Sequence, residues 1–479
     1  MNGLVVVANR LPVEVGADGQ LSTSPGGLAS ALSSVTTPGT HWVGWAGPES
    51  GRMQPFEHGD LQLHPVPLSS EEVERYYGGF SNAILWPLFH GRLRRVELNR
   101  AWWHAYRIVN RRFASAVCRI APIGGTVWIH DYHLLLVPAM IRAKRPDLHI
   151  GLFLHIPFPN AQLFSMLPWR TAVIEGMLGA EVLGFQVPDD VANFVAAADR
   201  LVGSRSKGHL LFDGAHVVDV DAFPISVDFD NWASLGDQAK ARAEQHRADL
   251  SVETLFLGID RLDYTKGISQ RLRAFGELLD EGHLDPEKCA FVQVAVPTRT
   301  DVPAYEDERD EVEAVVSRVN MKHQRHDGSR PLEYTDTSLD ETEVAGWFRA
   351  ADALVVTSLA DGMNLVAKEF VAARGDLGGT LILSEFAGAA QDLDGALIVN
   401  PYDIEAIKRS LVTAANMPIG ERAARMRTMR AAVQHNDVHR WARTFLERLQ
   451  SSTPVRASDL GLHGNDVKVA DSTTVRTLR

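Results

Sequence analysis

The sequence contains very little cysteine. Only Cys118 and Cys289 occur among 479 residues, and nothing resembles a Cys-x-x-Cys pair. This scarcity argues against a disulfide scaffold and against a cysteine-ligated zinc site. Uninterrupted apolar runs of 18 residues are also lacking, and no basic segment with a long apolar stretch precedes the first expected strand, at residues 4–8. We therefore expect a cytoplasmic protein that is not inserted in a membrane.

Basic residues are outnumbered. The chain has 48 lysines and arginines against 60 acidic residues, a formal net charge of −12. This balance disfavours a broad surface for nucleic acid or anionic membranes, so any affinity for phosphate must come from local sites. The apolar fraction of 45% and the charged fraction of 23% are ordinary for a globular protein. At this length two domains are expected rather than one, because single cores stop growing.

Short apolar runs alternate with longer helical patterns, which is typical of parallel βαβ units and predicts an α/β fold. The first series of expected strands comprises residues 4–8, 126–129, 150–154, 181–185 and 217–224, with helices at 98–119 and 133–144. The second series comprises strands at 254–259, 290–295, 331–334, 353–357 and 380–384, with helices at 268–281, 304–319, 340–350 and 364–374.

The two series meet in a polar stretch, residues 231–252, and we place the domain boundary there. Residues 1–232 are expected to form one Rossmann-like domain and residues 233–433 a second. A helical pattern over 434–451 is expected to return to the first domain. Residues 452–479 are rich in Ser, Thr, Asp and Gly with little apolar periodicity, which predicts a disordered tail.

The stretch from 361 to 369 carries the clearest chemical signal. It follows the apolar run 353–357 and reads as a strand end, a tight glycine turn and a helix start. The amides of residues 364–366 would lie at the helix N-terminus without intrahelical partners, where the macrodipole favours an anion such as a diphosphate. Glu369 can reach a hydroxyl beside that phosphate.

A second segment supplies cations. Arg261 and Lys266 lie five residues apart just after the expected strand 254–259. Arginine offers a planar fork for phosphate oxygens and lysine a compact charge, so the pair suits a leaving nucleoside diphosphate. Two doubly wound domains that face each other bring their strand ends to a central cleft. Polar residues follow expected strands throughout the chain, at Asn9, Arg10, His130, Asp131, His155, Arg261 and Asp361.

Nine segments, in order from residue 4 to about 448, resemble the trehalose-6-phosphate synthases, retaining glucosyltransferases with the two-Rossmann GT-B fold. They are Val-Ala-Asn-Arg-Leu-Pro at 7–12, Pro-Gly-Gly-Leu at 25–28, Tyr-Tyr at 76–77, Phe-Ser-Asn-Ala-Ile-Leu-Trp-Pro at 80–87, Trp-Ile-His-Asp-Tyr-His at 128–133, Leu-His-Ile-Pro-Phe-Pro at 154–159, Asp-Arg-Leu-Asp-Tyr-Thr-Lys-Gly at 260–267, and the segments 361–369 and 383–389.

The resemblance implies transfer of glucose from a nucleoside-diphosphate glucose to glucose 6-phosphate, giving α,α-trehalose 6-phosphate. It implies donor-binding roles for Gly26, Gly27, Arg261, Lys266, Leu339, Asp361, Asn364, Leu365, Val366 and Glu369, and it places the loop that contains Asp336 beside the donor nucleobase. It implies an acceptor site of Arg10, Tyr77, Trp86, Asp131 and Arg299. Catalysis would rest on Arg261, Lys266, Asp361, His155 and Asp131, with no cofactor, no essential metal and no protein nucleophile.

Two positions near the expected nucleobase depart from relatives. Many relatives carry arginine before Asp-Gly-Met-Asn, where this chain has Ala360, and the loop before the helix at 340–350 contains Asp336. A carboxylate can accept both N1–H and the exocyclic amine of guanine. We therefore predict a preference for GDP-glucose over UDP-glucose; the alternative is that Asp336 faces water and Ala360 changes nothing. Ser338 and Glu341 also have the spacing of a capping box.

Other interpretations stay open at this stage. Tyr77 and Trp86 could be core aromatics, and residues 130–133 could be read as a metal cluster, although neighbours on a strand end diverge. The acceptor could be another phosphorylated compound, as in a glucosylglycerol-phosphate synthase, or the chain could be a pseudo-glycosyltransferase or a silent regulatory protein. A nicotinamide dehydrogenase is disfavoured because Asn9-Arg10 replaces a glycine-rich loop. A homo-oligomer is possible.

Overall fold

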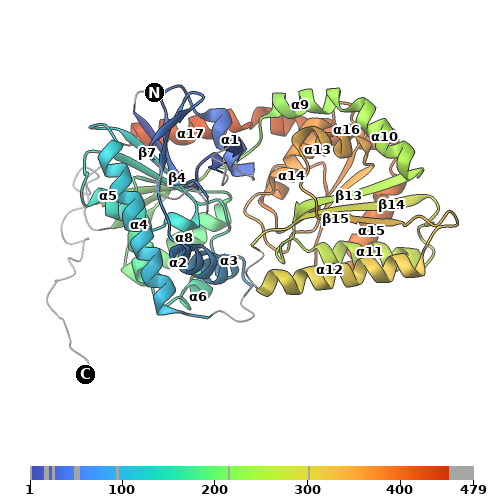
Figure 1. The fold of residues 1–479 in the computed structure, drawn as a ribbon, viewed down its shortest axis with the longest axis horizontal. Coiled ribbons are helices and arrows are strands. Elements are labelled where there is room, and N and C mark those ends of the chain that lie inside the picture. The colour runs from blue at the N-terminus through green and yellow to red at the C-terminus, as the bar shows by residue number, and fades with distance from the viewer. Residues whose placement is uncertain are drawn as a thin grey trace.

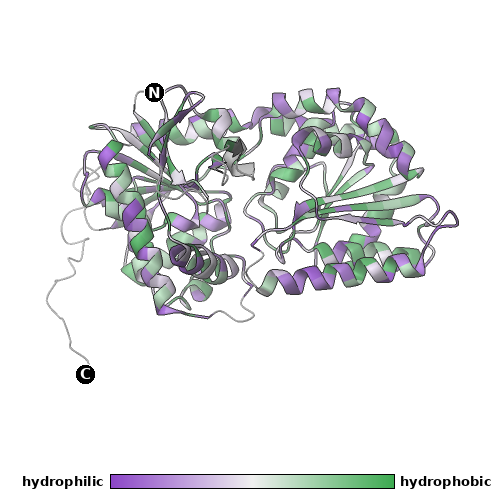
Figure 2. Cartoon of the chain, viewed as in Figure 1, coloured by the Kyte–Doolittle hydropathy of each residue, from purple (hydrophilic) through white to green (hydrophobic). Residues whose placement is uncertain are grey.

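The fold was described from a computed structural model. The structure describes residues 3–15, 21–23, 27–47, 54–92, 97–213, 216–299 and 303–452. Figure 1 shows two α/β lobes side by side, each with a central sheet flanked by helices. Green, hydrophobic residues line the strands and the inward helix faces in Figure 2, and purple residues lie on the outer faces. Each sheet is therefore buried between helical layers, as parallel sheets require.

The first sheet has ten strands in the order β10-β11-β12-β9-β8-β7-β1-β4-β6-β5. The pairings from β12 through β6 are parallel, while β10, β11 and β5 pair antiparallel at the edges. Its strands are β1 (Leu4–Arg10), β4 (His41–Trp45), β5 (Phe56–His58), β6 (Leu61–Pro65), β7 (Thr126–His130), β8 (His149–Phe153), β9 (Val182–Phe185), β10 (Arg205–Lys207), β11 (Leu210–Asp213) and β12 (His216–Ala222). A separate hairpin pairs β2 (Val13–Val15) with β3 (Leu21–Thr23).

The second sheet is parallel throughout, in the order β15-β14-β13-β16-β17-β18. Its strands are β13 (Thr254–Arg261), β14 (Cys289–Val296), β15 (Leu332–Thr335), β16 (Ala353–Val356), β17 (Thr380–Ser384) and β18 (Leu397–Val399). In this order the chain starts at β13, moves outward to β15 and then crosses back to β16, which is the doubly wound pattern.

The helices of the first lobe are α1 (Gly27–Val35), α2 (Ser70–Glu72), the π-helix η1 (Val73–Leu85), α3 (Trp86–Phe89), α4 (Arg100–Ile120), the 3₁₀ turn η2 (Tyr132–Leu134), α5 (Val137–Arg142), α6 (Ala161–Phe164), α7 (Arg170–Met177) and α8 (Pro188–Val202). The remaining helices are α9 (Phe229–Gln238), α10 (Lys240–Leu250), α11 (Ile268–Asp280), α12 (Pro303–Lys322), α13 (Glu341–Ala350), α14 (Leu365–Ala373), η3 (Gly388–Gln391), α15 (Ile404–Asn416), α16 (Ile419–His435) and α17 (Val438–Ser451).

The last helix, α17, packs against β8 and β9 of the first sheet, and Figure 1 shows it on that lobe, in red. The ring of Trp128 lies 5.0 Å from Trp441 and 5.2 Å from Phe445. Gly151 and Gly184 make room, because a Cβ at either would meet Phe445 within 2.8 Å. The chain thus crosses between the lobes twice, while the exact domain boundary at residue 232 stays a prediction.

Every strand expected in the two series is present, with ends that differ by a few residues. Two local predictions were wrong. The helix expected at 133–144 is the turn η2 followed by the short α5, because Pro138 cannot donate within a helix and starts a new one. The capping box expected from Ser338 is replaced by Asp340, whose carboxylate accepts the backbone N–H of Glu343 at 2.8 Å.

Candidate active site

One cavity of about 560 Å³ lies where the strand ends of both sheets converge. Its walls come from the ends of β1, β7 and β13, from the loops after β8 and β16, and from the start of α14. Most of the residues proposed from sequence line it: Arg10, Tyr77, Trp86, Asp131, His155, Arg261, Lys266, Arg299, Leu339, Asp361, Asn364, Leu365, Val366 and Glu369.

Three residues proposed for the donor are not placed there. Asp336 is exposed and does not line the cavity. Gly27 is the first residue of α1, and Gly26 lies outside the described residues. The donor role of the glycine pair stays a prediction.

At one end of the cavity a cation and a carboxylate are paired. Lys266 Nζ donates to Asp361 Oδ2 at 2.5 Å, and Asn364 Nδ2 donates to the same oxygen at 3.1 Å. Burial alone would raise the pKa of Asp361, but the charge and hydrogen bond of Lys266 outweigh it, so the pKa lies below the ordinary value. Asp361 is thus an ionised hydrogen-bond acceptor, and its proton is not available for acid catalysis at neutral pH.

The start of α14 faces the same end of the cavity. Asn364 adopts the left-handed region (φ 85°) and its side chain accepts the backbone N–H of Ala367 at 3.0 Å. Leu365 and Val366, as the first helical residues, keep backbone N–H groups without intrahelical acceptors. Arg261, at the exposed end of β13, adds a second cation beside Lys266. This end of the cavity can hold a diphosphate.

The other end combines aromatic rings with arginines. Arg10 lies 4.9 Å from the ring centroid of Trp45 and 5.7 Å from that of Tyr77. Arg299 lies 3.8 Å from the ring centroid of Trp86. Burial would raise the pKa of Tyr77, yet the arginines nearby lower it below the ordinary value. Two cations over aromatic faces suit a phosphorylated sugar.

Arg299 also joins the two lobes. Its guanidinium donates to Tyr132 Oη at 3.2 Å in the first lobe and to Asp263 Oδ2 at 3.3 Å in the second. Its backbone is left-handed (φ 50°), a conformation that persists in a non-glycine residue only when the surroundings hold it. Trp86 belongs to the buried core and also lines the cavity, so the two roles considered from the sequence coexist.

Asp131 and His155 form one unit. Asp131 is left-handed (φ 73°), and its carboxylate accepts the backbone N–H of His155 at 3.3 Å. Burial raises the pKa of Asp131 to about 6 and lowers that of His155 to about 3. The His155 ring lies 3.1 Å, nitrogen to nitrogen, from His130 and 3.4 Å from the amide nitrogen of Gln186. The imidazole is therefore neutral and held in place by two neighbours.

Glu369 lies where the cavity opens into a second one of about 430 Å³, bounded by α1, α9, α13 and α14. Leu339, Leu365 and Glu369 line both. Burial, and then the charge of Glu341, raise the pKa of Glu369 from 4.5 to about 8. A ribose with its hydroxyls at Glu369 would have its base directed into this second space.

The raised pKa of Glu369 predicts how the stability of the protein depends on pH. Between pH 4.5 and 8 the unfolded chain has released the proton of Glu369 while the folded protein still holds it, so stability falls as pH rises through this window and the penalty is constant above it. Glu369→Gln removes the penalty. We expect the melting temperature of the variant, relative to the parent, to increase from pH 5 to pH 8. A difference independent of pH, or the same trend in the exposed control Glu306→Gln, would contradict this.

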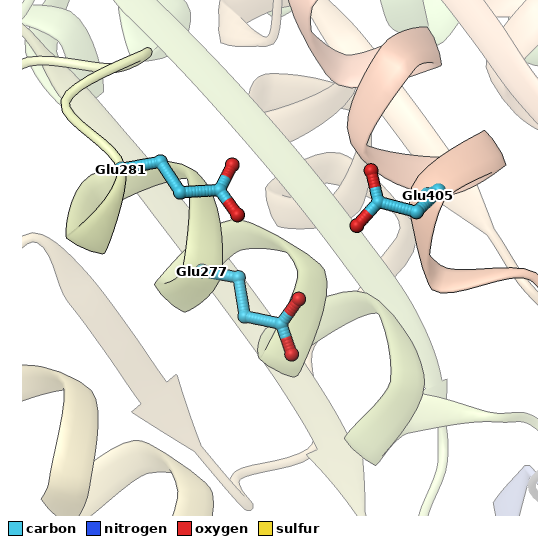
Figure 3. Close-up of side chains that lie close together, drawn as sticks. All are labelled: Glu277, Glu281 and Glu405. Atoms are coloured by element: carbon cyan, nitrogen blue, oxygen red, sulfur yellow. The ribbon is translucent and has the colours of Figure 1, made fainter.

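The described residues contain one carboxylate cluster with the spacing of a metal site, made of Glu277, Glu281 and Glu405 on α11, the turn after it and α15 (Figure 3). Lys408 accounts for it: its Nζ lies 2.5 Å from Glu281 and 2.8 Å from Glu405. The ammonium group occupies the position that a cation would take. Residues 130–133 do not converge either, since His130 faces His155 while His133 stacks on Tyr77 at 5.7 Å.

Several residues of the site were not found from the sequence. His90, Tyr132, His133 and Gln186 line the cavity, and Asp263 holds Arg299. Tyr132 and His133 stood inside a segment that was singled out, but only His130 and Asp131 of that segment were expected at the cleft. His90 and Gln186 carry no local signal, because their importance depends on neighbours far away in the chain.

Two Rossmann-like lobes that share one cavity, with cations and free helix amides at one end and arginines over aromatic rings at the other, have the architecture of a GT-B glycosyltransferase. The sequence pattern of glycosyltransferase family 20 matches residues 2–451. The chain is 46% identical to trehalose-6-phosphate synthase of Mycolicibacterium vanbaalenii, over 94% of this chain and 96% of that protein.

Solved structures agree. An α,α-trehalose-phosphate synthase (UDP-forming) from Burkholderia xenovorans, in complex with glucose-6-phosphate, superposes with a TM-score of 0.88 at 34% identity over 94% of this chain and 100% of the other. A structure from E. coli bound with UDP-2-fluoro glucose gives 0.85 at 33% identity, over 94% and 100%. The chain belongs to glycosyltransferase family 20. None of its described helices is long and apolar enough to cross a membrane.

Proposed function

We propose that this protein transfers glucose from a nucleoside-diphosphate glucose to glucose 6-phosphate, with retention, and so forms α,α-trehalose 6-phosphate. The observation that carries the proposal is the single cavity with a cation and amide end and an arginine and aromatic end. The relatives named above are trehalose-6-phosphate synthases, and one is in complex with glucose-6-phosphate. Both substrates would thus meet in one space.

The donor diphosphate is proposed to lie on Arg261, Lys266 and the amides at the start of α14. Charge grows on the diphosphate as the glycosidic bond breaks, and preorganised donors stabilise it by roughly 3 kcal/mol each. Asp361, held by Lys266 and Asn364, would accept hydroxyls of the donor glucose. His155, which lines the same cavity, would hold hydroxyls of the same sugar.

The acceptor phosphate is proposed to lie between Arg10 and Arg299, with Tyr77 and Trp86 enclosing the sugar. Asp131 would accept ring hydroxyls. No carboxylate pair is placed for double displacement in this proposal, so the donor phosphate itself takes the acceptor proton on the face from which it leaves. The enclosure by Arg299, Trp86 and Tyr77 favours glucose 6-phosphate over a smaller phosphorylated acceptor such as glycerol phosphate.

The activity is tested by incubating purified protein with glucose 6-phosphate and UDP-, GDP- or ADP-glucose, and measuring released nucleotide and disaccharide phosphate. Formation of α,α-trehalose 6-phosphate supports the proposal. Turnover only with another phosphorylated acceptor would favour a related synthase that uses that acceptor. Failure with every donor and acceptor would favour a silent regulatory protein.

The nucleobase remains the finer part of the proposal. We propose GDP-glucose as the preferred donor, on the chemistry of Asp336 and the space left by Ala360. Asp336 belongs to the loop that ends at Leu339, which lines both cavities, although its own side chain is exposed in this structure. The B. xenovorans relative is named UDP-forming, so the preference has to be measured on this chain.

Two substitutions test the nucleobase. Because one bidentate contact to a base is worth about 1–3 kcal/mol, Asp336→Asn should lower the GDP/UDP ratio of kcat/KM by roughly tenfold or more. Ala360→Arg should lower it by filling the space for a purine. If neither variant changes the ratio, Asp336 and Ala360 have no part in donor choice. The exposed Asp327→Asn serves as a control for the loss of one surface charge.

A further inference from the structure

His90, the residue after α3, has one ring nitrogen committed to the protein. Its Nδ1 lies 2.8 Å from the carbonyl oxygen of Trp86, and its ring centroid lies 4.1 Å from that of Trp86. A carbonyl oxygen can only accept, so Nδ1 carries the hydrogen and Nε2 carries a lone pair. The backbone of α3 therefore sets both the tautomer and the orientation of the imidazole.

His90 is part of the wall of the active-site cavity. His90 lines it and is only 6% exposed. Within the described part of the chain, no hydrogen bond reaches Nε2. The ring contacts Trp86 of the arginine and aromatic end, and the charges of Asp263, Asp361 and Lys266 act on it from the second lobe. An acceptor at a cavity wall that the protein does not satisfy is open to a donor on a bound ligand.

The chemistry of Nε2 restricts what it can bind. Burial lowers the pKa of His90 to about 4, so the ring is neutral at physiological pH. A neutral ring with its lone pair toward the ligand repels phosphate oxygens, which also carry only lone pairs. A hydroxyl group can donate to it. Between the phosphate groups and the sugar hydroxyls of the two substrates, only the hydroxyls fit.

We propose that His90 is a substrate-binding residue whose Nε2 accepts a hydrogen bond from a hydroxyl of a sugar bound between Trp86 and Asp361. This inference rests on the proposed glucosyl transfer, since it requires a sugar at that place. It adds an uncharged acceptor to the carboxylates Asp131 and Asp361. Unlike Asp361, which is paired with Lys266, His90 accepts without carrying a charge.

The test compares His90→Phe with the parent. Phenylalanine keeps an aromatic ring against Trp86 but removes the acceptor, and kcat/KM with glucose 6-phosphate should fall about tenfold to a hundredfold. His90→Gln places an amide oxygen near the position of Nε2 and should recover part of the loss. The control is His216→Phe, since the ring of His216 also bonds a backbone carbonyl, of Ala180 at 3.0 Å, but does not line the cavity.

Substrate analogues decide between binding and packing. Both proteins are assayed with glucose 6-phosphate lacking the 2-, 3- or 4-hydroxyl, and with donors whose glucose lacks the 3-, 4- or 6-hydroxyl. For the analogue without the partner hydroxyl, parent and His90→Phe should become equal within about twofold, and this analogue tells whether acceptor or donor is bound. Equal losses on all analogues, or no loss on any, would overturn the inference.

A second measurement distinguishes failure of the proposed glucosyl transfer from failure of the proposed His90 contact. If the parent forms no disaccharide phosphate, calorimetry of glucose 6-phosphate and of each nucleotide sugar with parent and His90→Phe still measures the contact. A tenfold weaker dissociation constant that disappears with one deoxy analogue supports the role of His90. Unchanged dissociation constants reject it. If His90→Phe melts much lower than the parent, His90→Gln and His90→Asn replace it in the same comparison.

Discussion

Arg261→Ala is expected to lower kcat by about a thousandfold while the melting temperature changes little. Arg261 is exposed at the end of β13, and its nearest ring contact is Trp86 at 5.9 Å. In the described part of the chain no ion pair to it is found, so its removal leaves no buried partner unpaired. Loss of one preorganised donor at a departing anion costs about 10²–10³ in rate.

The measurement is kcat, KM for the donor and the thermal melting curve of the same preparation. Arg261→Lys should recover only part of the rate, because an ammonium group cannot replace a bidentate guanidinium. Arg273→Ala on α11, where the side chain is 60% exposed and pairs with Glu277, is the matched control and should be active. Near-normal turnover of Arg261→Ala would remove Arg261 from the donor site.

Gly362→Ala is expected to reduce activity by about a hundredfold without contacting either substrate. A Cβ at Gly362 would lie 2.2 Å from the carbonyl oxygen of His155 in the opposite lobe, well inside contact distance. The turn cannot easily retreat, because three backbone hydrogen bonds tie Asp361 and Met363 to residues 386–389. The displacement, of about 1 Å, would fall on Asp361 and His155, and such a shift can cost 10²-fold.

Steady-state kinetics and small-angle scattering with and without substrates test this second effect. The variant should melt near the parent temperature but fail to reach the closest approach of the lobes. The control is Gly420→Ala on α16, where an added Cβ meets nothing within 4 Å. If Gly362→Ala were fully active, close contact between Gly362 and His155 would not be needed for turnover.

The strands were predictable because buried parallel strands are nearly continuous apolar runs. Strands of mixed composition were not predicted. β4 and β6 contain His41, His64 and Pro65, and they are strands because β4 pairs with β1 and with β6. The π-helix η1 was missed as well. Its buried residues, such as Tyr76 and Phe80, follow a spacing that the usual helical period does not match.

The site residues likewise fall into those that local sequence predicts and those that depend on distant contacts. Lys266 and the α14 amides were found because a strand end, a glycine turn and a helix start are written in consecutive residues. The role inferred for His90 could not be found that way. It requires Trp86 O to set the tautomer and Asp361, 271 positions later in the chain, to face the same cavity. The exposure of Asp336 likewise depends on how its loop packs, not on its neighbours in sequence.

The amino-acid sequence by itself determined the α/β class, the two series of strands and the short motifs that follow them, because these depend on local periodicity and on groups a few residues apart. Only the tertiary structure decided which motifs share a cavity, which carboxylates are paired and which nitrogen stays free. Those properties arise from contacts such as Arg299 with Tyr132 and Gly362 with His155, between segments joined only by folding. Burial and neighbouring charge, which set each pKa, exist only once these segments meet.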